Sequence, residues 1–324
     1  MEIALSPTTP GLAAGELVDL CVAAEAVGYS TAWLAEVAGP EGFSMAGAIA
    51  SATSKLELGV AVVAAGNRTP ALLAMGASTV SQLLGGRAFA VGVGSSSEVI
   101  MEKWHGRSFA EPLGRVRETV QATRAALAGE RDYRGRHASM ASFRLDGAPA
   151  GPVPVYVGAL GPRMLQLAGE VGDGVCLNLM PPEAVPRQLA EVAIGASRAE
   201  RTPSGFGVMA RIFWVPGDPA MGRQAIRRAF GPYFAQPVYN RFLAWCGYPE
   251  EAAVIAAAFA AGDREAVGVA FSDEIIDSIA LLGSADDARE RLKSFEAAGV
   301  GVAAVSILAP DAASVTAAME QLTA

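Results

Sequence analysis

The residues Gly158-Ala159-Leu160-Gly161 form a run of small and apolar residues directly after an apolar segment of the chain. Pro162 follows this run, and proline is favoured in the first turn of a helix. Glycines before a helix let backbone N–H groups approach a ligand, and the positive end of the helix attracts an anion. The pattern is typical of a phosphate-binding turn, but a tight turn that needs glycine only for its geometry has the same signature.

A second candidate segment contains three consecutive serines, Ser95, Ser96 and Ser97, followed by Glu98. It comes after Gly92-Val93-Gly94, which is similar to the start of a dinucleotide-binding fingerprint but lacks the third glycine of that motif. The hydroxyl groups and the carboxylate are instead suited to hydrogen bonds with a heterocycle or a substrate. A solvated turn is the alternative interpretation.

Two further side chains are candidates for proton transfer. Glu36 directly follows the apolar segment 33–35, and His105 lies shortly after the serine segment. An imidazole titrates near neutral pH, and a carboxyl group can serve as acid or base. The alternative roles are a solvated acid for Glu36 and a loop histidine bonded to the backbone for His105. The second histidine, His137, is expected to be structural or exposed.

These residues need a scaffold, and the chain alternates short apolar runs with longer amphipathic segments throughout its length. Such alternation indicates βα units and a parallel sheet. We count eight units, which favours a closed (β/α)8 TIM barrel of the α/β class over a doubly wound open sheet. Strands are expected at Glu2–Leu5, Thr31–Ala35, Leu56–Val63, Ala88–Val93, Val153–Val157, Gly174–Leu177, Phe206–Trp214 and Val302–Leu308. Helices are expected at Ala13–Val27, Pro70–Leu84, Leu113–Ala128, Pro162–Val171, Pro182–Ala199 and Ala285–Ala298.

Two intervals exceed the usual spacing of such units, and both are predicted to be insertions in a single domain that spans residues 1–324. Gly129–Gly151 is expected to form a β-hairpin after the fourth helix, and Pro216–Ser284 a mostly helical cap after the seventh strand. Ligands of a barrel bind at the C-terminal ends of its strands. Those ends here are Ser6, Glu36, Gly66–Asn67, Ser95–Glu98, Gly158–Gly161, Asn178 and Ala309–Pro310.

Composition argues against several classes of function. The net charge of −8 offers no basic surface for nucleic acid. The cysteines Cys21, Cys176 and Cys246 are far apart with no histidine cluster nearby, so neither a disulfide framework nor a metal site is expected. The first residues lack the features of a signal peptide, and the apolar runs are too short to span a membrane. We therefore expect a cytoplasmic protein.

Five segments together carry a resemblance to a known family. They are VGYSTAWLAE, LELGVAVVAAGNRTPALLAMGASTVSQLLGGRAFAVGVGSSS, RGRHASMASFRLDG, VPVYVGALGPRMLQLAGEVGDGVCLN and LLGSADDARERLKSFEAAGV. In their order and spacing the chain resembles the luciferase-like monooxygenase superfamily. Within it, the chain is most similar to the coenzyme F-420 (deazaflavin)-dependent oxidoreductases related to methylenetetrahydromethanopterin reductase. The resemblance covers nearly the whole chain.

This resemblance implies a homodimeric barrel that holds a deazaflavin at the strand ends and acts on a small-molecule substrate. The cofactor phosphate would lie at the glycine run, and the ring would lie against a bulge in the third strand, where relatives often hold a non-prolyl cis peptide bond. The implied cofactor-binding residues are Ala61, Val62, Ser95, Ser96, Ser97, Gly158, Ala159, Leu160, Gly161 and Asn178. No metal ligand is implied.

The chain also departs from its relatives. Many of them have a histidine after the acid that ends the second strand, whereas Val37 follows Glu36 here. Sugar-phosphate dehydrogenases of the group carry an acid at the position of Ser97, and this chain has an acid only at the neighbouring Glu98. The second departure argues against oxidation of glucose-6-phosphate.

The leading hypothesis is therefore hydride transfer between C5 of a deazaflavin and a small organic substrate. Glu36 and His105 are the candidate proton donors, and Ser97 or Glu98 is a candidate substrate contact. An FMN-dependent monooxygenase that uses reduced flavin and oxygen is the first alternative. A flavin-binding protein without catalytic activity, suggested by the missing histidine, is the second.

Overall fold

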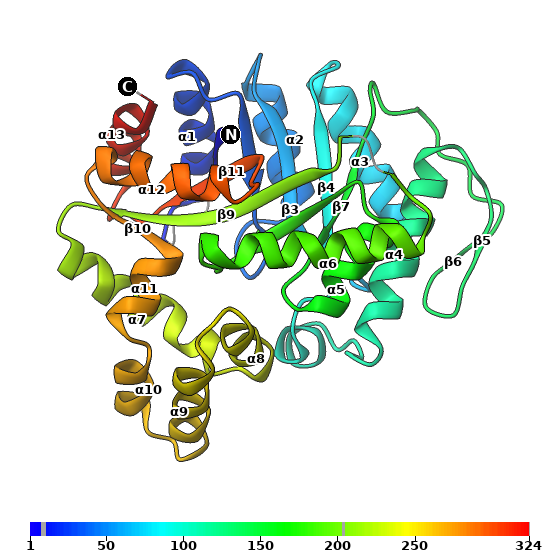
Figure 1. The fold of residues 1–324 in the computed structure, drawn as a ribbon. Helices are drawn as coiled ribbons and strands as arrows, with labels where there is room; N and C mark the ends of the chain where they lie inside the picture. Colours follow the sequence, from blue (N-terminus) through cyan, green and yellow to red (C-terminus); the bar gives the residue numbers. More distant parts are fainter. Residues whose placement is uncertain (8–10, 203–204, 324) are drawn as a thin grey trace.

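A closed parallel β-barrel forms the centre of the computed structural model, which describes residues 1–7, 11–202 and 205–323 (Figure 1). In hydrogen-bonded order its strands are β1 (Glu2–Leu5), β2 (Thr31–Leu34), β3 (Glu57–Ala64), β4 (Phe89–Gly94), β7 (Val155–Gly158), β8 (Gly174–Asn178), β9 (Gly207–Pro216) and β11 (Val302–Ile307). Pairing of β8 with β9, and of β11 with both β9 and β1, closes the ring. Each barrel strand overlaps a predicted one, so the prediction of a (β/α)8 barrel is confirmed.

The helices that follow the barrel strands cover the outside of the barrel (Figure 1). They are α1 (Ala14–Ala26), α2 (Gly42–Ala52), α3 (Pro70–Leu84), α4 (Pro112–Leu127), α5 (Pro162–Val171), the 3₁₀ turn η2 (Pro182–Ala184) with α6 (Val185–Arg198), α12 (Ala285–Ala297) and α13 (Ala312–Thr323). The bounds of α3 and α5 are those that the sequence predicts. In α3 both ends carry strong signals, because Thr69 accepts a hydrogen bond from the N–H of Leu72 and Gly85 ends the helix at φ 64°.

The first insertion is the predicted hairpin, formed by the antiparallel strands β5 (Tyr133–Arg134) and β6 (Ser139–Met140). Glu118 of α4 fixes it to the barrel, because its carboxylate accepts backbone hydrogen bonds from the hairpin, among them one of 2.8 Å from Ala138. His137 lies in this hairpin with Nε2 3.2 Å from a carboxylate oxygen of Glu111. The structural role expected for His137 agrees with this contact.

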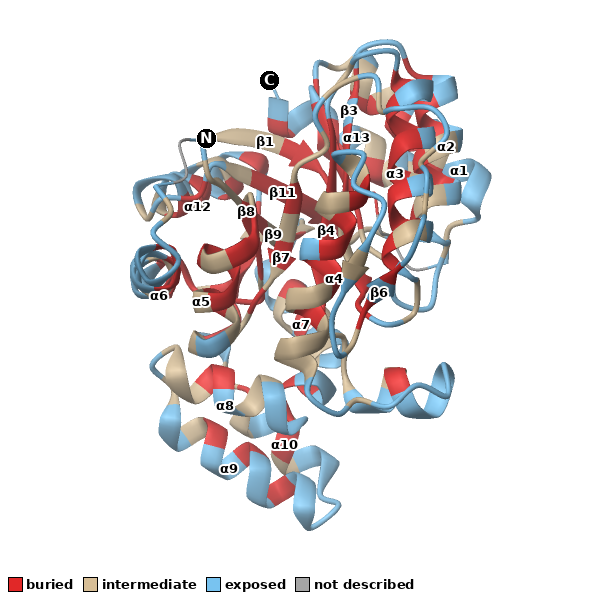
Figure 2. Cartoon of the chain, turned by 90° about the vertical axis from the view of Figure 1, so that its right-hand side faces the viewer, coloured by how far each residue is buried: buried red, intermediate tan, exposed pale blue. Residues whose placement is uncertain are grey.

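The second insertion is a cap of five helices, α7 (Pro219–Phe234), α8 (Pro237–Trp245), α9 (Pro249–Ala260), α10 (Arg264–Ala270) and α11 (Asp273–Ile279). Helices α8, α9 and α10 project from the barrel and carry broad exposed faces, whereas the barrel strands are mostly buried (Figure 2). Prolines begin α7, α8 and α9. A hydrophobic core of its own, which includes Phe234 and Phe271, joins the cap to Phe213 of β9.

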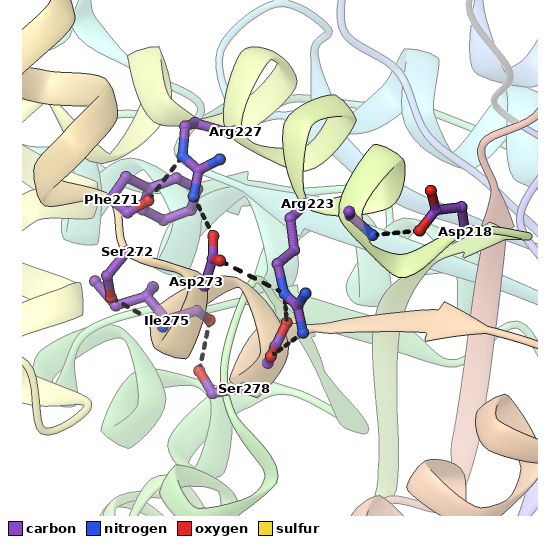
Figure 3. A network of polar contacts seen from close by, with 10 residues as sticks. Asp218, Arg223, Arg227, Phe271, Ser272, Asp273, Ile275 and Ser278 are labelled. Atoms are coloured by element: carbon purple, nitrogen blue, oxygen red, sulfur yellow. Dashed lines mark hydrogen bonds and ion pairs between the residues drawn. The ribbon is translucent and has the colours of Figure 1, made fainter.

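Ion pairs attach α7 to α11 and to the chain before it (Figure 3). Arg223 donates two hydrogen bonds, of 2.7 and 2.8 Å, to the carboxylate of Asp277. Arg227 donates to the Phe271 carbonyl at 3.2 Å and to Asp273 at 2.5 Å. Together with the aromatic core, these contacts hold the cap in a defined position beside the ends of β8 and β9.

The prediction of a mostly helical insertion is confirmed, but its last residues before Ser284 are not helical. Residues Ala280–Gly283 form a strand, β10, that pairs in parallel with Phe213–Pro216 of β9. Strand β8 pairs with β9 only as far as Arg211, so the edge of β9 beyond that point is open to another strand. A four-residue apolar run is equally compatible with a strand and with the end of a helix, which is why periodicity does not reveal β10.

Among the described residues, no helix combines the length and the apolar character that a membrane span requires. The three cysteines all carry free thiols.

Glu25, near the C-terminal end of α1, ties this helix to the chain before β3. Its carboxylate accepts hydrogen bonds from the backbone N–H groups of Ser54, Lys55 and Leu56, at 2.6 to 2.9 Å. Burial raises the pKa of this carboxyl group, but the hydrogen bonds outweigh that effect and lower the pKa from 4.5 to about 2. The ionised form of Glu25 is therefore favoured by folding.

We predict that Glu25→Gln lowers the free energy of unfolding at neutral pH by about 1 kcal/mol, a value that allows for solvent screening. The stabilisation is fully present above pH 4.5, the unfolded-state pKa, and is lost as the pH falls toward 2. Urea denaturation of both proteins over this range measures it. The side chain of Glu57 is exposed and forms no hydrogen bond or ion pair with a described residue, so Glu57→Gln is the control variant. A difference between wild type and Glu25→Gln that does not shrink in acid would contradict the prediction.

Candidate active site

Strand alternation decides which side chains line the barrel interior near the C-terminal ends of the strands. An interior cluster contains Ala4, Trp33, Ala90, Cys176, Met209 and Ala304. Because side chains two residues apart share a face of a strand, the next inward positions lie nearer the mouth of the barrel. On β4 and β7 these positions are glycines, whereas on β8, β9 and β11 they are Asn178, Arg211 and Ser306. The mouth of the barrel is therefore lined by small residues on one side and by polar residues on the other.

A bulge in β3 shapes the apolar side. The pairing of β3 with β4 shifts register between Val60 and Val63, and the Ala61–Val62 peptide bond is cis. Both features lie where the family resemblance implies them, so that expectation is confirmed.

The side chain of Val62 occupies space that three glycines leave free. A Cβ atom added to Gly92, Gly94 or Gly158 would lie 3.0, 2.6 or 2.8 Å from a methyl carbon of Val62. Real Cβ atoms essentially never come as close as the values for Gly94 and Gly158, and the value for Gly92 is tighter than most real contacts. Strands β4 and β7 therefore accept the bulge because they carry glycine at these positions. The recess that results is specific to this combination of residues, and we call Gly92, Gly94 and Gly158 the glycine recess.

The predicted phosphate turn runs directly from β7 into α5. Gly161 is the residue before the helix, and no side chain caps this end. The N–H of Ala159 is used in a 3.1 Å hydrogen bond to the carbonyl of Cys176. Within the described chain, no group accepts a hydrogen bond from the N–H of Gly161 or of Arg163 in the first turn. This helix end therefore keeps backbone donors available for an anion, and the exposed Arg163 adds a positive charge beside them.

The hydroxyl groups of Ser95 and Ser97 form hydrogen bonds with nearby backbone groups. The serine segment leads into a π-helical turn, η1 (Val99–Trp104), which the sequence analysis did not foresee. Ser96 has a φ of 61°, Ser95 Oγ donates to the Ser96 carbonyl at 3.2 Å, and Ser97 Oγ accepts from the N–H of Ile100 at 3.3 Å. Ser95 also lines a small hollow with Ala65, Met101, Ser108, Phe109, Pro112 and Arg115. The serines thus remain at the end of β4, within reach of the mouth.

Glu98 and His105 flank the π-helical turn, and both side chains are exposed. Neither side chain forms a hydrogen bond or ion pair with another described residue, and in particular none joins His105 to Glu36. No hydrogen bond or ion pair of the described residues therefore links the two candidate proton donors.

Glu36 is held in an ion pair at the end of β2. Arg68 donates hydrogen bonds of 2.7 and 2.8 Å to its two carboxylate oxygens, and the N–H of Gly42 donates a third of 2.8 Å. The side chains of Glu36 and Arg68 are only 16% and 15% exposed. Arg68 also pairs with Glu41, the residue that caps α2. The ion pair fixes the start of α2 and the loop after β3. Sequence analysis does not identify Arg68 as the partner of Glu36, because residues 36 and 68 are far apart in the chain.

The polar side of the mouth contains a buried amide oxygen without a hydrogen-bond donor and a guanidinium group without an ion pair among the described residues. Asn178 and Arg211 lie side by side in the pairing of β8 with β9. The side-chain oxygen of Asn178 is buried and accepts no hydrogen bond from the described residues. The guanidinium group of Arg211 forms no ion pair with a described carboxylate. Sequence analysis named Asn178 and missed Arg211, although a single charge inside the apolar strand FGVMARIFW was a usable signal.

The parallel barrel, the bulged third strand and the uncapped helix after β7 define an α/β barrel with a candidate small-molecule site at its mouth. The family model of the luciferase-like monooxygenases matches residues 1–301, and the chain belongs to this family. The members are oxidoreductases, which places the chain in that class of enzyme.

Individual relatives agree with this assignment. The chain is 31% identical over 297 residues to a 5,10-methylenetetrahydromethanopterin reductase of Archaeoglobus fulgidus, with 89% of this chain and 88% of the relative covered. It is 27% identical over 320 residues to a putative coenzyme F420-dependent oxidoreductase of Mycobacterium tuberculosis, with 89% of each covered. Among solved structures, an F420-dependent secondary alcohol dehydrogenase in complex with an F420-acetone adduct has the same fold, with a TM-score of 0.81, 19% identity and coverage of 99% and 97%.

We predict that Gly94→Ala distorts the bulge, because its methyl group would lie 2.6 Å from Val62. Overpacking of this kind costs about 1–3 kcal/mol of stability. The double variant Gly94→Ala, Val62→Ala should recover most of that loss, since it removes the colliding methyl groups. Thermal denaturation of the single and double variants measures the coupling. Strictly additive effects of the two substitutions would show that Val62 does not fill the glycine recess.

Proposed function

We propose that the chain is a deazaflavin (coenzyme F420)-dependent oxidoreductase that transfers a hydride between the cofactor and a small organic substrate. The observation that carries the proposal is the glycine recess, because it brings the β3 bulge and the turn before α5 together at one side of the mouth. A flat ring requires small residues beneath it, and a phosphate requires free N–H donors beside it. The relatives named for F420 support the choice of cofactor.

The residues present fit this cofactor in four places. Ala61 and Val62 would support one face of the ring, and the buried oxygen of Asn178 would accept a hydrogen bond from a ring N–H. The turn from Gly158 to Gly161 would hold the phosphate, with Arg163 beside it. Ser95, Ser96 and Ser97 would close the pocket from the end of β4. When bound, a deazaflavin supplies two-electron chemistry by giving or accepting a hydride at C5.

The proposal gives the candidate acids and bases different tasks. The exposed imidazole of His105, which no described side chain binds, would carry the proton that accompanies hydride transfer. Glu98 would contact substrate. Glu36 remains a candidate donor, but its three hydrogen bonds favour a positioning role, in which the ion pair with Arg68 keeps the start of α2 and the loop after β3 at the mouth.

We also propose that the chain works as a cytoplasmic homodimer. Leu72, Met75 and Leu83 of α3 expose 50%, 50% and 47% of their surface, and their spacing places them along one face of that helix. A second copy of the chain would cover this apolar face.

Separate titrations with F420 and with FMN test the proposed function. We expect F420 to bind at micromolar concentration or below, and FMN to bind at least tenfold more weakly. Arg163→Gln should weaken binding of F420 about tenfold, because a charge-assisted contact to phosphate is lost. The same variant should leave unchanged the binding of an 8-hydroxy-deazaflavin that lacks phosphate. Arg144 is exposed and has no described side-chain partner, so Arg144→Gln is the matched control.

The outcomes separate the hypotheses. Tighter binding of FMN than of F420 would favour an FMN-dependent monooxygenase. If neither cofactor binds at micromolar concentration, both the F420-dependent oxidoreductase and the FMN-dependent monooxygenase are excluded. If F420 binds but is neither reduced nor reoxidised across a broad panel of alcohols, carbonyl compounds and alkenes, the chain is a binding protein without catalysis.

A further inference from the structure

Arg211 is a charged residue in the inward-facing row of β9. Met209 lies in the interior cluster of the barrel, so Arg211, two residues further on, points to the same side at the level of the mouth. Its Nε donates a 2.9 Å hydrogen bond to the hydroxyl of Ser306 on β11. The guanidinium carbon lies 4.6 Å from the centre of the Phe213 ring. These contacts fix the orientation of the guanidinium but leave both terminal nitrogens without a partner among the described residues.

The setting of Arg211 differs from that of other partly buried arginines in the chain. Arg68 is paired with Glu36 and Glu41, and Arg223 with Asp277. Burial lowers the pKa of Arg211 to about 10, and only the hydroxyl groups of Tyr233 and Tyr239 oppose this shift. The group is therefore a cation at neutral pH that has lost part of its hydration without gaining a carboxylate among the described residues. Such a group costs stability unless a ligand compensates it.

Aromatic side chains from the cap enclose the same space. The centres of the Phe213 and Phe230 rings are 4.4 Å apart. The ring of Tyr233 contacts the rings of both Phe230 and Tyr239. Burial raises the pKa of Tyr239, so its hydroxyl stays protonated and can donate a hydrogen bond. Asn178, the proposed partner of the cofactor ring, lies beside both Arg211 and Tyr239. A molecule bound at Arg211 would thus be adjacent to the ring, on the side away from the β3 bulge.

We propose that Arg211 binds the carboxylate of the substrate, and that the enzyme acts on organic acids with an apolar body. The two terminal nitrogens of a guanidinium match the two oxygens of a carboxylate. Tyr239 provides a further donor, and the rings of Phe213 and Phe230 contact the apolar body. The assignment rests on the proposed function for the position of the cofactor, but the anion site itself is a property of the chain.

Calorimetric titration of the full chain without cofactor tests the proposal, with benzoate and hexanoate as probes and benzamide and hexanamide as neutral analogues. We expect the acids to bind the wild type at least tenfold more tightly than the amides. Arg211→Met should raise the dissociation constants of the acids at least tenfold. Arg211→Lys keeps the positive charge but lacks the two terminal nitrogens of the guanidinium. Its dissociation constants for the acids should lie between those of the wild type and of Arg211→Met. Arg241→Met removes one charge from an exposed position of α8 and should behave as the wild type.

Stability measurements separate a ligand site from a structural role. Because Arg211 has no ion pair to lose, Arg211→Met should keep or raise the melting temperature. The proposal is overturned if neither acid binds the wild type below about 10 mM, which corresponds to less than 3 kcal/mol of binding free energy. It is also overturned if the amides bind as tightly as the acids. Two results with Arg211→Met would overturn it as well: unchanged dissociation constants for the acids, or a folded variant with a clearly lower melting temperature.

A titration with F420 distinguishes the substrate from the acidic tail of the cofactor as the source of the anion. We expect Arg211→Met to bind F420 within twofold of the wild type. A loss of F420 binding as large as the loss of benzoate binding would assign Arg211 to the cofactor and overturn this inference, while the proposed function would stand. Failure of F420 to bind the wild type would instead overturn the proposed function, whatever the result with benzoate.

Discussion

The contact between Val62 and the glycine recess is the constraint on which the shape of the barrel mouth depends. Any Cβ atom on Gly94 or Gly158 would collide with Val62, at 2.6 or 2.8 Å. The bulge in β3, the lack of a side chain at Gly92, Gly94 and Gly158, and the turn from Gly158 to Gly161 that leads into α5 therefore belong together. Val62 fills the space at the three glycines, and the turn ends at a helix in which the N–H groups of Gly161 and Arg163 have no acceptor among the described residues.

The opposite side of the mouth is built from β8, β9 and β11 and carries the polar groups. Asn178 and Arg211 are neighbours in the sheet, and Ser306 fixes the guanidinium from the next strand. The cap helices stand over this side because β9 continues past β8 and carries β10 on its free edge. This division of the mouth into an apolar half and a polar half would give the proposed flat cofactor and the proposed charged substrate separate, adjacent surfaces.

Sequence patterns predict the eight barrel strands because each is a short apolar run, and they predict α3 and α5 because proline begins both helices. The cis bond at Ala61–Val62 was found through family resemblance alone, since no local pattern of residues encodes it. Contacts between distant residues were not predictable. The partner of Glu36 is Arg68, which reaches it only after β2 and β3 pair, and the isolation of Arg211 becomes visible only when every nearby carboxylate has been placed.

We propose that one deazaflavin lies across the glycine recess with its phosphate at the start of α5. A crystal structure of the chain with F420 is the decisive test. We expect ring atoms in van der Waals contact with Val62, a phosphate oxygen within hydrogen-bond distance of the N–H of Gly161 or Arg163, and the Asn178 oxygen bonded to the ring. A ring bound elsewhere, or a phosphate held away from α5, would contradict it.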